Sequence, residues 1–261
     1  MKQASAMAFI CLLLLICSAA LATDIPKSIG FQLPATWDEA IHADSLKIID
    51  ITDTTDITFE REIDLNGNLL MPGFKDAHTH SPMTFLRSYA DDLPLQDWLY
   101  QQVFPMEDKL TPELIYEYTK LAILEYLTSG ITASFDMYFE LDDYVKACTE
   151  MGFRSVLCGS VSGDESNAER LEEYYNKYNG LDPLISFRLG FHAEYTCDIK
   201  LLERIADLAS KYKAPVSTHN SETKKEVREC IEKYSKTPTQ LFESLGLYNY
   251  GGAGFHCVHM S

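Results

Sequence analysis

LMPGFKDAHTH, residues 70–80, ends in two histidines that stand two positions apart, His78 and His80. The Pro-Gly pair is a turn signal, and the residues after it have the character of a short strand. On an extended strand, residues i and i+2 point to the same side, so both imidazoles can reach one cation. A lone His-x-His pair is weak evidence, so the rest of the chain decides whether it marks a metal site.

Strand-like stretches alternate with helical patterns after this motif. The expected strands are 70–77, 131–135, 154–158, 185–191, 215–218 and 253–256. The expected helices are 111–127, 141–151, 168–178, 199–212 and 224–245, the last in two pieces. Such alternation indicates βαβ units around a parallel sheet. A complete barrel of this kind has eight strands, so the chain predicts an incomplete (β/α)8 TIM-like barrel with about six of eight strands.

Histidines close four of these six strands. His78 and His80 end the first, His192 ends the fourth, His219 the fifth and His256 the sixth, in a chain that has only seven histidines. Active groups of parallel α/β barrels lie at the carboxyl ends of the strands. The arrangement therefore predicts that these imidazoles gather at one end of the barrel.

The N-terminal residues have a different character. Lys2 is followed by an apolar run from Ala6 to Ala22, and Ala20-Leu21-Ala22 offers the small residues of a cleavage site. This pattern is typical of a signal peptide, and the run is short for a membrane span. We expect a signal-peptide-like leader over 1–22, a partial β-sandwich segment over 23–69 and a truncated barrel over 70–261. An uncleaved anchor and a wrongly assigned start are the alternatives. The location is secreted or extracytoplasmic if the leader is genuine, and cytoplasmic otherwise.

Charge and cysteine usage narrow the class of ligand. The formal net charge of -17 repels nucleic acid and anionic membrane surfaces. We therefore expect a small-molecule substrate, no nucleic acid and no membrane contact beyond the leader, and a homo-oligomer is compatible with the sequence. Five cysteines outside the leader show no C-x-x-C spacing, which argues against a disulfide framework or a zinc ribbon. We expect most of them to be buried packing residues.

Longer motifs carry a family resemblance. They are HSPM (80–83), LR (86–87), WL (98–99), PME (105–107), GFHAEYTC (190–197), THNSET (218–223) and HCVH (256–259). With the His-Thr-His opening, in this order and at these distances, the chain resembles the amidohydrolase superfamily. Within it, the chain looks like the methylthioadenosine/S-adenosylhomocysteine deaminases, close to the triazine hydrolases. The resemblance covers about residues 31–261.

The resemblance implies a role for nine residues. It matches His78, His80 and His219 to metal ligands, Glu222 and His256 to catalytic groups, and Glu107, His192, Trp98 and Arg170 to substrate contacts. The implied cofactor is one divalent metal ion, with zinc preferred and iron or nickel as alternatives. Glu222 would move protons between water and a ring nitrogen, and His256 would hydrogen-bond the attacking water or the developing oxyanion.

Four of these assignments have a structural alternative. His192 can be a buried histidine whose hydrogen bonds are satisfied, and Glu222 can be a carboxylate favoured at a helix N-terminus. Trp98 can be a core or lid residue, and Glu107 can be a solvated charge. These alternatives stay open at the level of the sequence.

The implied reaction is deamination of an aminopurine nucleoside or a related aminated heterocycle by a metal-dependent hydrolase of non-peptide C–N bonds. Glu107 favours a nucleoside, because a carboxylate can accept two ribose hydroxyls. Hydrolysis of another ring substituent or of a cyclic amide is the alternative enzyme function. An inactive, metal-binding amidohydrolase fragment is the alternative from another class.

Departures from the family pattern lead to two further expectations. The family has a metal-binding aspartate at the end of strand eight, and we expect the present chain to be truncated before it, so that an open barrel leaves exposed edges and an unstable or inactive polypeptide. The stretch Leu157-Cys158-Gly159-Ser160 stands where the deaminases have an arginine, and Glu194 stands where they have a proline. Both departures argue against an anionic substrate such as S-adenosylhomocysteine.

Overall fold

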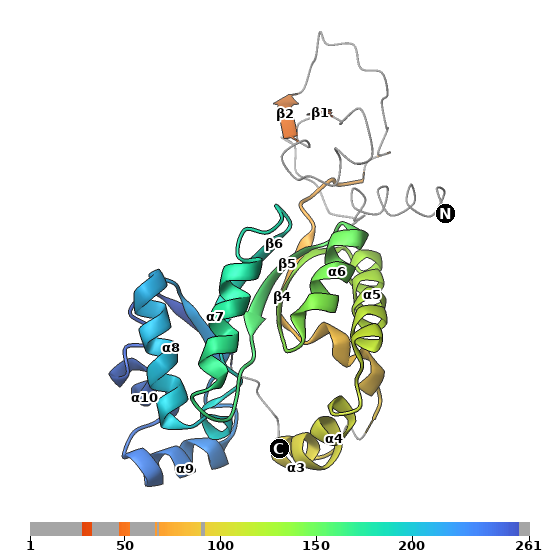
Figure 1. Cartoon of the computed structure of the whole chain (residues 1–261). Coiled ribbons are helices and arrows are strands. Elements are labelled where there is room, and N and C mark those ends of the chain that lie inside the picture. Colours follow the sequence, from red (N-terminus) through yellow and green to blue (C-terminus); the bar gives the residue numbers. More distant parts are fainter. Residues whose placement is uncertain (1–27, 33–46, 53–65, 67, 90–91, 256–261) are drawn as a thin grey trace. The chain divides into compact units, whose positions relative to one another are not determined.

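The computed structural model describes residues 28–32, 47–52, 66, 68–89 and 92–255 (Figure 1). The chain divides into two compact units, one made of residues 1–75 and 125–132 and the other of residues 76–124 and 133–261. The predicted boundaries at 22 and 69 stay predictions, and the leader lies outside the described residues. None of the helices in the described part is long and apolar enough to cross a membrane.

The secondary structure alternates as the sequence predicts. The strands are β1 (Ser28–Gln32), β2 (Lys47–Thr52), β3 (Phe74–Thr79), β4 (Ile131–Tyr138), β5 (Arg154–Gly159), β6 (Ile185–Gly190), β7 (Val216–His219) and β8 (Gly252–Phe255). The longer helices are α5 (Pro112–Thr128), α6 (Leu141–Met151), α7 (Asn167–Tyr178), α8 (Ile199–Tyr212), α9 (Lys224–Tyr234) and α10 (Pro238–Ser244). Short helical segments are η2 (Ser81–Leu86), α3 (Leu95–Trp98), η3 (Leu99–Val103), α4 (Phe104–Glu107) and η4 (Glu194–Thr196).

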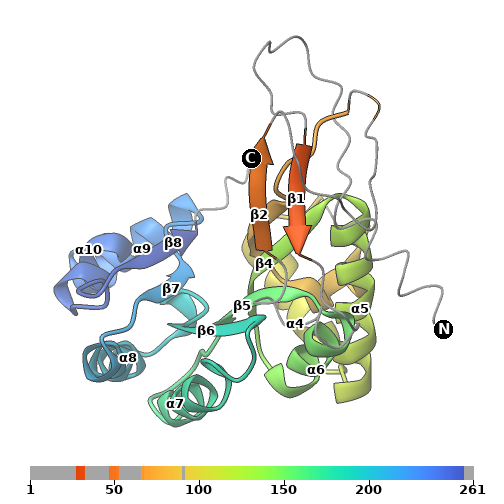
Figure 2. The ribbon, with the colours of Figure 1, turned by 90° about the horizontal axis from the view of Figure 1, so that it is seen from above.

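One six-stranded sheet, in the order β3-β4-β5-β6-β7-β8, carries the fold. The pairs from β4 to β8 are parallel. Figure 2 shows strands β5 to β8 following a curve, with α7 and α8 on its outer side. The predicted incomplete TIM-like barrel of six strands is confirmed. All carboxyl ends of a parallel sheet point to the same edge, which brings the strand-terminal histidines to one region.

Local sequence explains the elements that were predicted well. α8 buries Leu201, Leu202, Ile205, Leu208 and Ala209, a spacing that places them on one helical face. α6 ends where Gly152 takes a left-handed conformation with φ 65°, which glycine adopts without strain. These local signals explain why α6 and α8 occupy the predicted ranges.

Two expectations about boundaries need correction. The first barrel strand starts at Phe74 rather than at residue 70, because Pro72-Gly73 ends any extended pairing before it. Residues 81–107, for which no helix was expected, hold four short helical segments. These segments pack around a small apolar cluster of Leu86, Leu95, Leu99 and Val103. Helices this short depend on such packing rather than on propensity.

The N-terminal segment has a two-stranded sheet in which β1 and β2 pair antiparallel. Most of the range 23–69, where a partial β-sandwich segment is expected, lies outside the described residues, and β1 and β2 are the strands described within it. The cysteines Cys148, Cys158, Cys197 and Cys230 are free and buried, as expected, and Cys257 lies outside the described residues.

Candidate metal and active site

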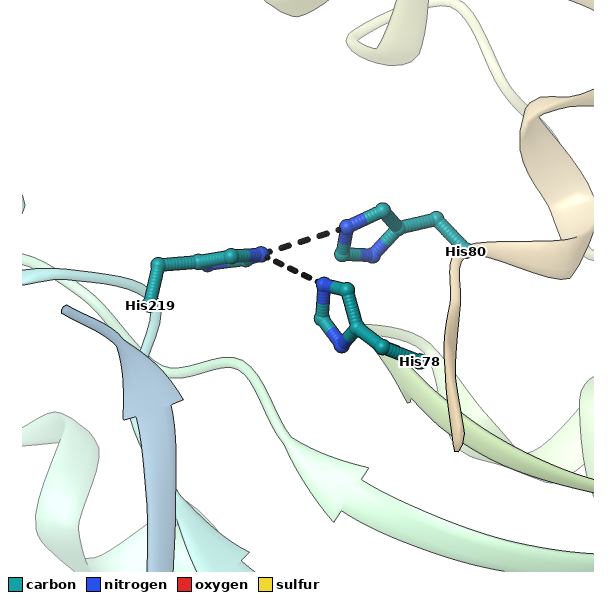
Figure 3. A group of neighbouring side chains, drawn as sticks. All are labelled: His78, His80 and His219. Atoms are coloured by element: carbon teal, nitrogen blue, oxygen red, sulfur yellow. Dashed lines mark hydrogen bonds between the residues drawn. The ribbon is translucent and has the colours of Figure 1, made fainter. Parts of the chain in front are cut away.

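Three histidines converge at the carboxyl ends of two strands that are far apart in the sheet order. His78 lies in β3, His80 directly follows it, and His219 ends β7. The Nε2 atom of His219 lies 3.0 Å from Nε2 of His78 and 3.3 Å from Nε2 of His80 (Figure 3). Among the described residues these three form a group whose ligand atoms all lie within 4.8 Å of one another. The structure therefore brings the predicted ligand set together.

Main-chain carbonyl groups determine which ring nitrogen of His80 and of His219 carries the hydrogen. Nδ1 of His80 lies 2.7 Å from the carbonyl oxygen of Met137, and Nδ1 of His219 lies 2.8 Å from that of His192. A carbonyl oxygen only accepts, so each Nδ1 donates its hydrogen and each Nε2 keeps its lone pair. This is the usual outer-shell arrangement of metal-binding imidazoles.

The third ring packs against an aromatic side chain. His78 stacks on Phe255, with ring centroids 4.0 Å apart. Its Nδ1 is buried, and no hydrogen-bond partner for it occurs among the described residues. Three converging Nε2 atoms, two of them with an established lone pair, fit a divalent cation.

The electrostatics keep the cluster neutral. Burial, and then the neighbouring His80 and His219, lower the pKa of His78 to about 3. Burial and His219 lower the pKa of His80 to about 4, and burial also lowers the pKa of His219. Neutral imidazole is the form that binds a metal. At neutral pH these side chains are already neutral, so they can bind a metal without first releasing a proton.

A buried carboxyl group holds the chain just beyond His80. Asp136 of β4 accepts a hydrogen bond from the backbone N–H of Ser81 at 3.1 Å and another from the Ser81 hydroxyl. The Tyr144 hydroxyl donates to the same carboxyl group at 2.7 Å. Burial raises the pKa of Asp136 to about 7, although these donors oppose the shift. The next residue, Met137, provides the carbonyl for His80, so β4 fixes this ligand twice.

His192 supports His219 through its main chain. Its carbonyl oxygen accepts from the N–H of His219 at 3.0 Å as well as from Nδ1 of the same residue. The His192 ring lies 5.0 Å from the His219 ring between centroids, and its Nδ1 lies 3.1 Å from Thr196 Oγ1. Burial lowers the pKa of His192 to about 3. The predicted residue thus lies beside the histidine cluster.

Glu222 is buried and lies three residues beyond His219. The Tyr195 hydroxyl donates to Glu222 Oε2 at 3.1 Å. The Tyr195 ring lies 6.0 Å from that of His192, which in turn adjoins His219. These contacts link the carboxylate to the histidine cluster.

Glu107 is held at the carboxyl end of β4. The Tyr138 hydroxyl donates to Glu107 Oε1 at 2.8 Å. Burial raises the pKa of Glu107 to about 7. This half-buried, hydrogen-bonded carboxyl group differs from the solvated charge that was the alternative reading.

The other predicted residues have varied surroundings. Trp98 ends α3 and packs against the cluster of Leu86, Leu95, Leu99 and Val103, as does Tyr195. Arg170 of α7 makes an ion pair with Glu140 and donates to the Tyr174 hydroxyl. His256 lies outside the described residues. The substrate roles of Trp98 and Arg170 and the catalytic role of His256 stay predictions.

Several supporting groups were missed at the level of the sequence. Tyr195 lies inside the quoted motif 190–197 but received no role, and Tyr138 and Asp136 received none either. The sequence does point to Asp136, because a carboxyl group inside the strand ITASFDMY needs hydrogen-bond donors when it is buried. It does not point to the carbonyls of Met137 and His192, since every residue has one.

Comparison with known proteins agrees with this geometry. The model of the Amidohydrolase family matches residues 69–261. A 5-methylthioadenosine/S-adenosylhomocysteine deaminase of Caldicellulosiruptor saccharolyticus is 39% identical over 220 residues, which are 82% of this chain and 51% of the relative. The deaminase of the same name from Syntrophomonas wolfei is 43% identical over 209 residues, 78% of this chain and 48% of the relative. The chain spans about half the length of the curated relatives it matches.

Solved structures resemble the fold. An adenosine deaminase from Xanthomonas campestris with bound zinc is similar with a TM-score of 0.65 at 36% identity, over 70% of this chain and 44% of that one. An atrazine chlorohydrolase from Arthrobacter aurescens complexed with zinc has a TM-score of 0.66 at 21% identity, over 77% of this chain and 52% of that one. At that identity the second likeness shows the fold alone.

Proposed function

The chain belongs to the amidohydrolase family, and from this premise we propose that it is a metal-dependent hydrolase that deaminates an aminopurine nucleoside or a related aminated heterocycle. The observation that carries the proposal is the convergence of three neutral imidazoles, two of them with Nδ1 tied to a carbonyl. The relatives named as methylthioadenosine/S-adenosylhomocysteine deaminases and the adenosine deaminase with bound zinc support the choice of reaction.

His78, His80 and His219 would hold the metal, and we propose zinc. A bound divalent ion would supply Lewis-acid chemistry and lower the pKa of water toward ~7. Neutral nitrogen ligands suit zinc, with iron and nickel as alternatives.

Glu222 is the proposed proton carrier. Its carboxylate accepts a proton from the attacking water, whose oxygen bonds to the ring carbon that bears the amino group. Glu222 then returns the proton to a ring nitrogen, which assists the loss of aromaticity at that carbon. The proton that remains on the added oxygen then passes to the amino group, the carbon–nitrogen bond breaks and ammonia leaves, so that the ring keeps the oxygen of the water in place of the amino nitrogen. His256 is proposed to stabilise the developing oxyanion.

Glu107 and His192 are the proposed substrate contacts near this centre. A carboxylate at Glu107 can accept hydrogen bonds from two ribose hydroxyls, and Tyr138 holds it for that purpose. His192 adjoins the metal cluster and presents a neutral ring. Trp98 and Arg170 are proposed as more distant contacts of the base and of the distal part of the substrate.

Ammonia release from adenosine, methylthioadenosine and guanine, with metal analysis of the same preparation, tests the proposal. We expect about one divalent ion per chain and ammonia from at least one nucleoside. Glu222→Gln should keep the metal and lose turnover by about 100-fold or more, because it loses the proton-carrying carboxylate and leaves the imidazoles in place. Glu229→Gln is the matched control, since Glu229 is an exposed glutamate of α9.

Two outcomes would contradict the proposal. A metal-loaded protein that releases no ammonia from any of these compounds, but hydrolyses a cyclic amide or another ring substituent, would assign the site to the alternative chemistry. A metal-loaded protein with no turnover on any of them would identify a metal-binding fragment.

A further inference from the structure

The loop that carries Glu222 has an unusual backbone. Ser221, between His219 and α9, has a left-handed conformation with φ 57°. A residue other than glycine is strained in this conformation. The loop therefore needs other interactions to keep its backbone in place. The peptide that Ser221 shares with Glu222 therefore depends on its surroundings.

A second glutamate holds this peptide. Glu226, in the first turn of α9, is fully buried. Its Oε1 accepts from the backbone N–H of Ser221 at 3.1 Å, and its Oε2 accepts from the backbone N–H of Glu222 at 2.7 Å. One carboxyl group thus grips two successive amides, which fixes the direction in which the Glu222 side chain leaves the main chain.

The sequence pattern alone accounts for only part of what Glu226 does. Thr223 and Glu226 have the spacing of a capping box, in which the glutamate returns to the N–H of the capping residue. Thr223 does cap α9, accepting from the Glu226 N–H at 3.1 Å. The Glu226 carboxyl group also accepts from the backbone N–H groups of the two residues before Thr223. These two additional hydrogen bonds restrain the loop that carries Glu222.

Tyr195 restrains the carboxyl end of the Glu222 side chain. Its hydroxyl donates to Glu222 Oε2, while its ring packs against the apolar cluster of Leu86, Leu95, Leu99 and Val103. Glu226 therefore restrains the main chain of Glu222, and Tyr195 restrains its carboxyl group. Precise placement of this kind matters for proton transfer, because a displacement of about 1 Å can cost roughly 100-fold in rate.

We propose that Glu226 is a positioning residue that locks the Ser221–Glu222 peptide and so presents the Glu222 carboxylate for proton transfer, with Tyr195 as its partner at the other end of that side chain. The inference rests on the proposed role of Glu222. It adds a residue that acts on Glu222 through the main chain.

A double-mutant cycle tests the proposal. Glu226→Gln keeps the volume but places an amide NH2 against a backbone N–H. We expect kcat to fall by about 10- to 100-fold, with KM and metal content within about twofold of the parent. Combined with Glu222→Gln, Glu226→Gln should add no further loss, because its effect passes through Glu222. Glu229→Gln, on the exposed side of the same helix, should match the parent.

Two further measurements keep the test decisive. Amide hydrogen exchange at Ser221 and Glu222 should accelerate in Glu226→Gln and not in Glu229→Gln, and this readout needs no activity. Tyr195→Phe removes the hydroxyl that donates to Glu222 Oε2. It should lower kcat several-fold without changing the exchange rates of the Ser221 and Glu222 amides.

Outcomes that overturn the positioning role are distinct from failure of the proposed function. Unchanged exchange at both amides, an equal loss in the Glu222→Gln background, or loss of metal would each overturn it. A parent protein without deaminase activity would refute the proposed function, and in that case the exchange rates alone decide whether Glu226 locks the loop.

Discussion

Glu107 is a residue whose ionisation its surroundings oppose. Burial raises its pKa to about 7, from an ordinary value of 4.5, while the Tyr138 hydroxyl donates to it. Between these two values the folded protein binds more protons than the unfolded chain at this group. The contribution of Glu107 to the free energy of unfolding therefore decreases as the pH rises through this window.

Replacing Glu107 with glutamine should remove this decrease in the free energy of unfolding at high pH. The amide oxygen can still accept from Tyr138, but it has no charge to bury. We expect Glu107→Gln to be close to the parent in stability near about pH 4 and more stable than the parent near about pH 8. Urea unfolding at the two pH values measures the difference, with the exposed Glu232→Gln as control. An advantage of the variant that is the same at both values would contradict the expectation.

Among the strands, β6 depends on one glycine for its close packing. A Cβ atom added at Gly190 would lie 2.4 Å from Cys158 Sγ, 2.6 Å from the Ser217 carbonyl oxygen and 2.7 Å from that of Gly159. Two of these neighbours are backbone atoms of β7 and β5, which cannot turn aside. Close approach of the three strands at this point positions His192, only two residues later.

Gly190→Ala should therefore lower stability as an overpacked site does, by about 1–3 kcal/mol, and should also weaken metal binding by displacing the His192 carbonyl from His219. Denaturant unfolding and metal titration measure the two effects. Ser210→Ala, on the exposed side of α8, is the control for a small substitution without a clash. Parent-like stability in Gly190→Ala would show that the strands can separate without cost.

Across the molecule, the histidine cluster joins distant parts of the chain. His219 is 141 residues from His78 and 139 from His80. The unfolded chain does not hold these ligands together, so a metal that binds the folded site stabilises it by mass action. A cation present at a hundred times its Kd would contribute about 2.7 kcal/mol.

Chelation should accordingly lower the Tm of the metal-loaded protein, and readdition of zinc should restore it. The variant His219→Asn lacks one ligand, so its Tm should respond much less to chelator or zinc. Differential scanning calorimetry with and without chelator measures both. An equal response of parent and variant would place the stabilising metal elsewhere.

The sequence was sufficient for the order of the barrel strands and the longer helices, and for the histidines at the strand ends. Hydrophobic periodicity and turn residues act over a few positions, so α6, α8 and the parallel β4–β8 arrangement could be predicted from local patterns. The positions of His78, His80 and His219 followed, because parallel strands share one carboxyl edge.

The supporting contacts depended on the packed fold. The carbonyls of Met137 and His192 are chemically ordinary, and they matter because strand pairing brings them to the ring nitrogens of His80 and His219. Glu226 has the spacing of a helix cap, yet the left-handed turn at Ser221 delivers two other amides to it. Such contacts join groups through space, so their energies are absent from any local pattern of residues.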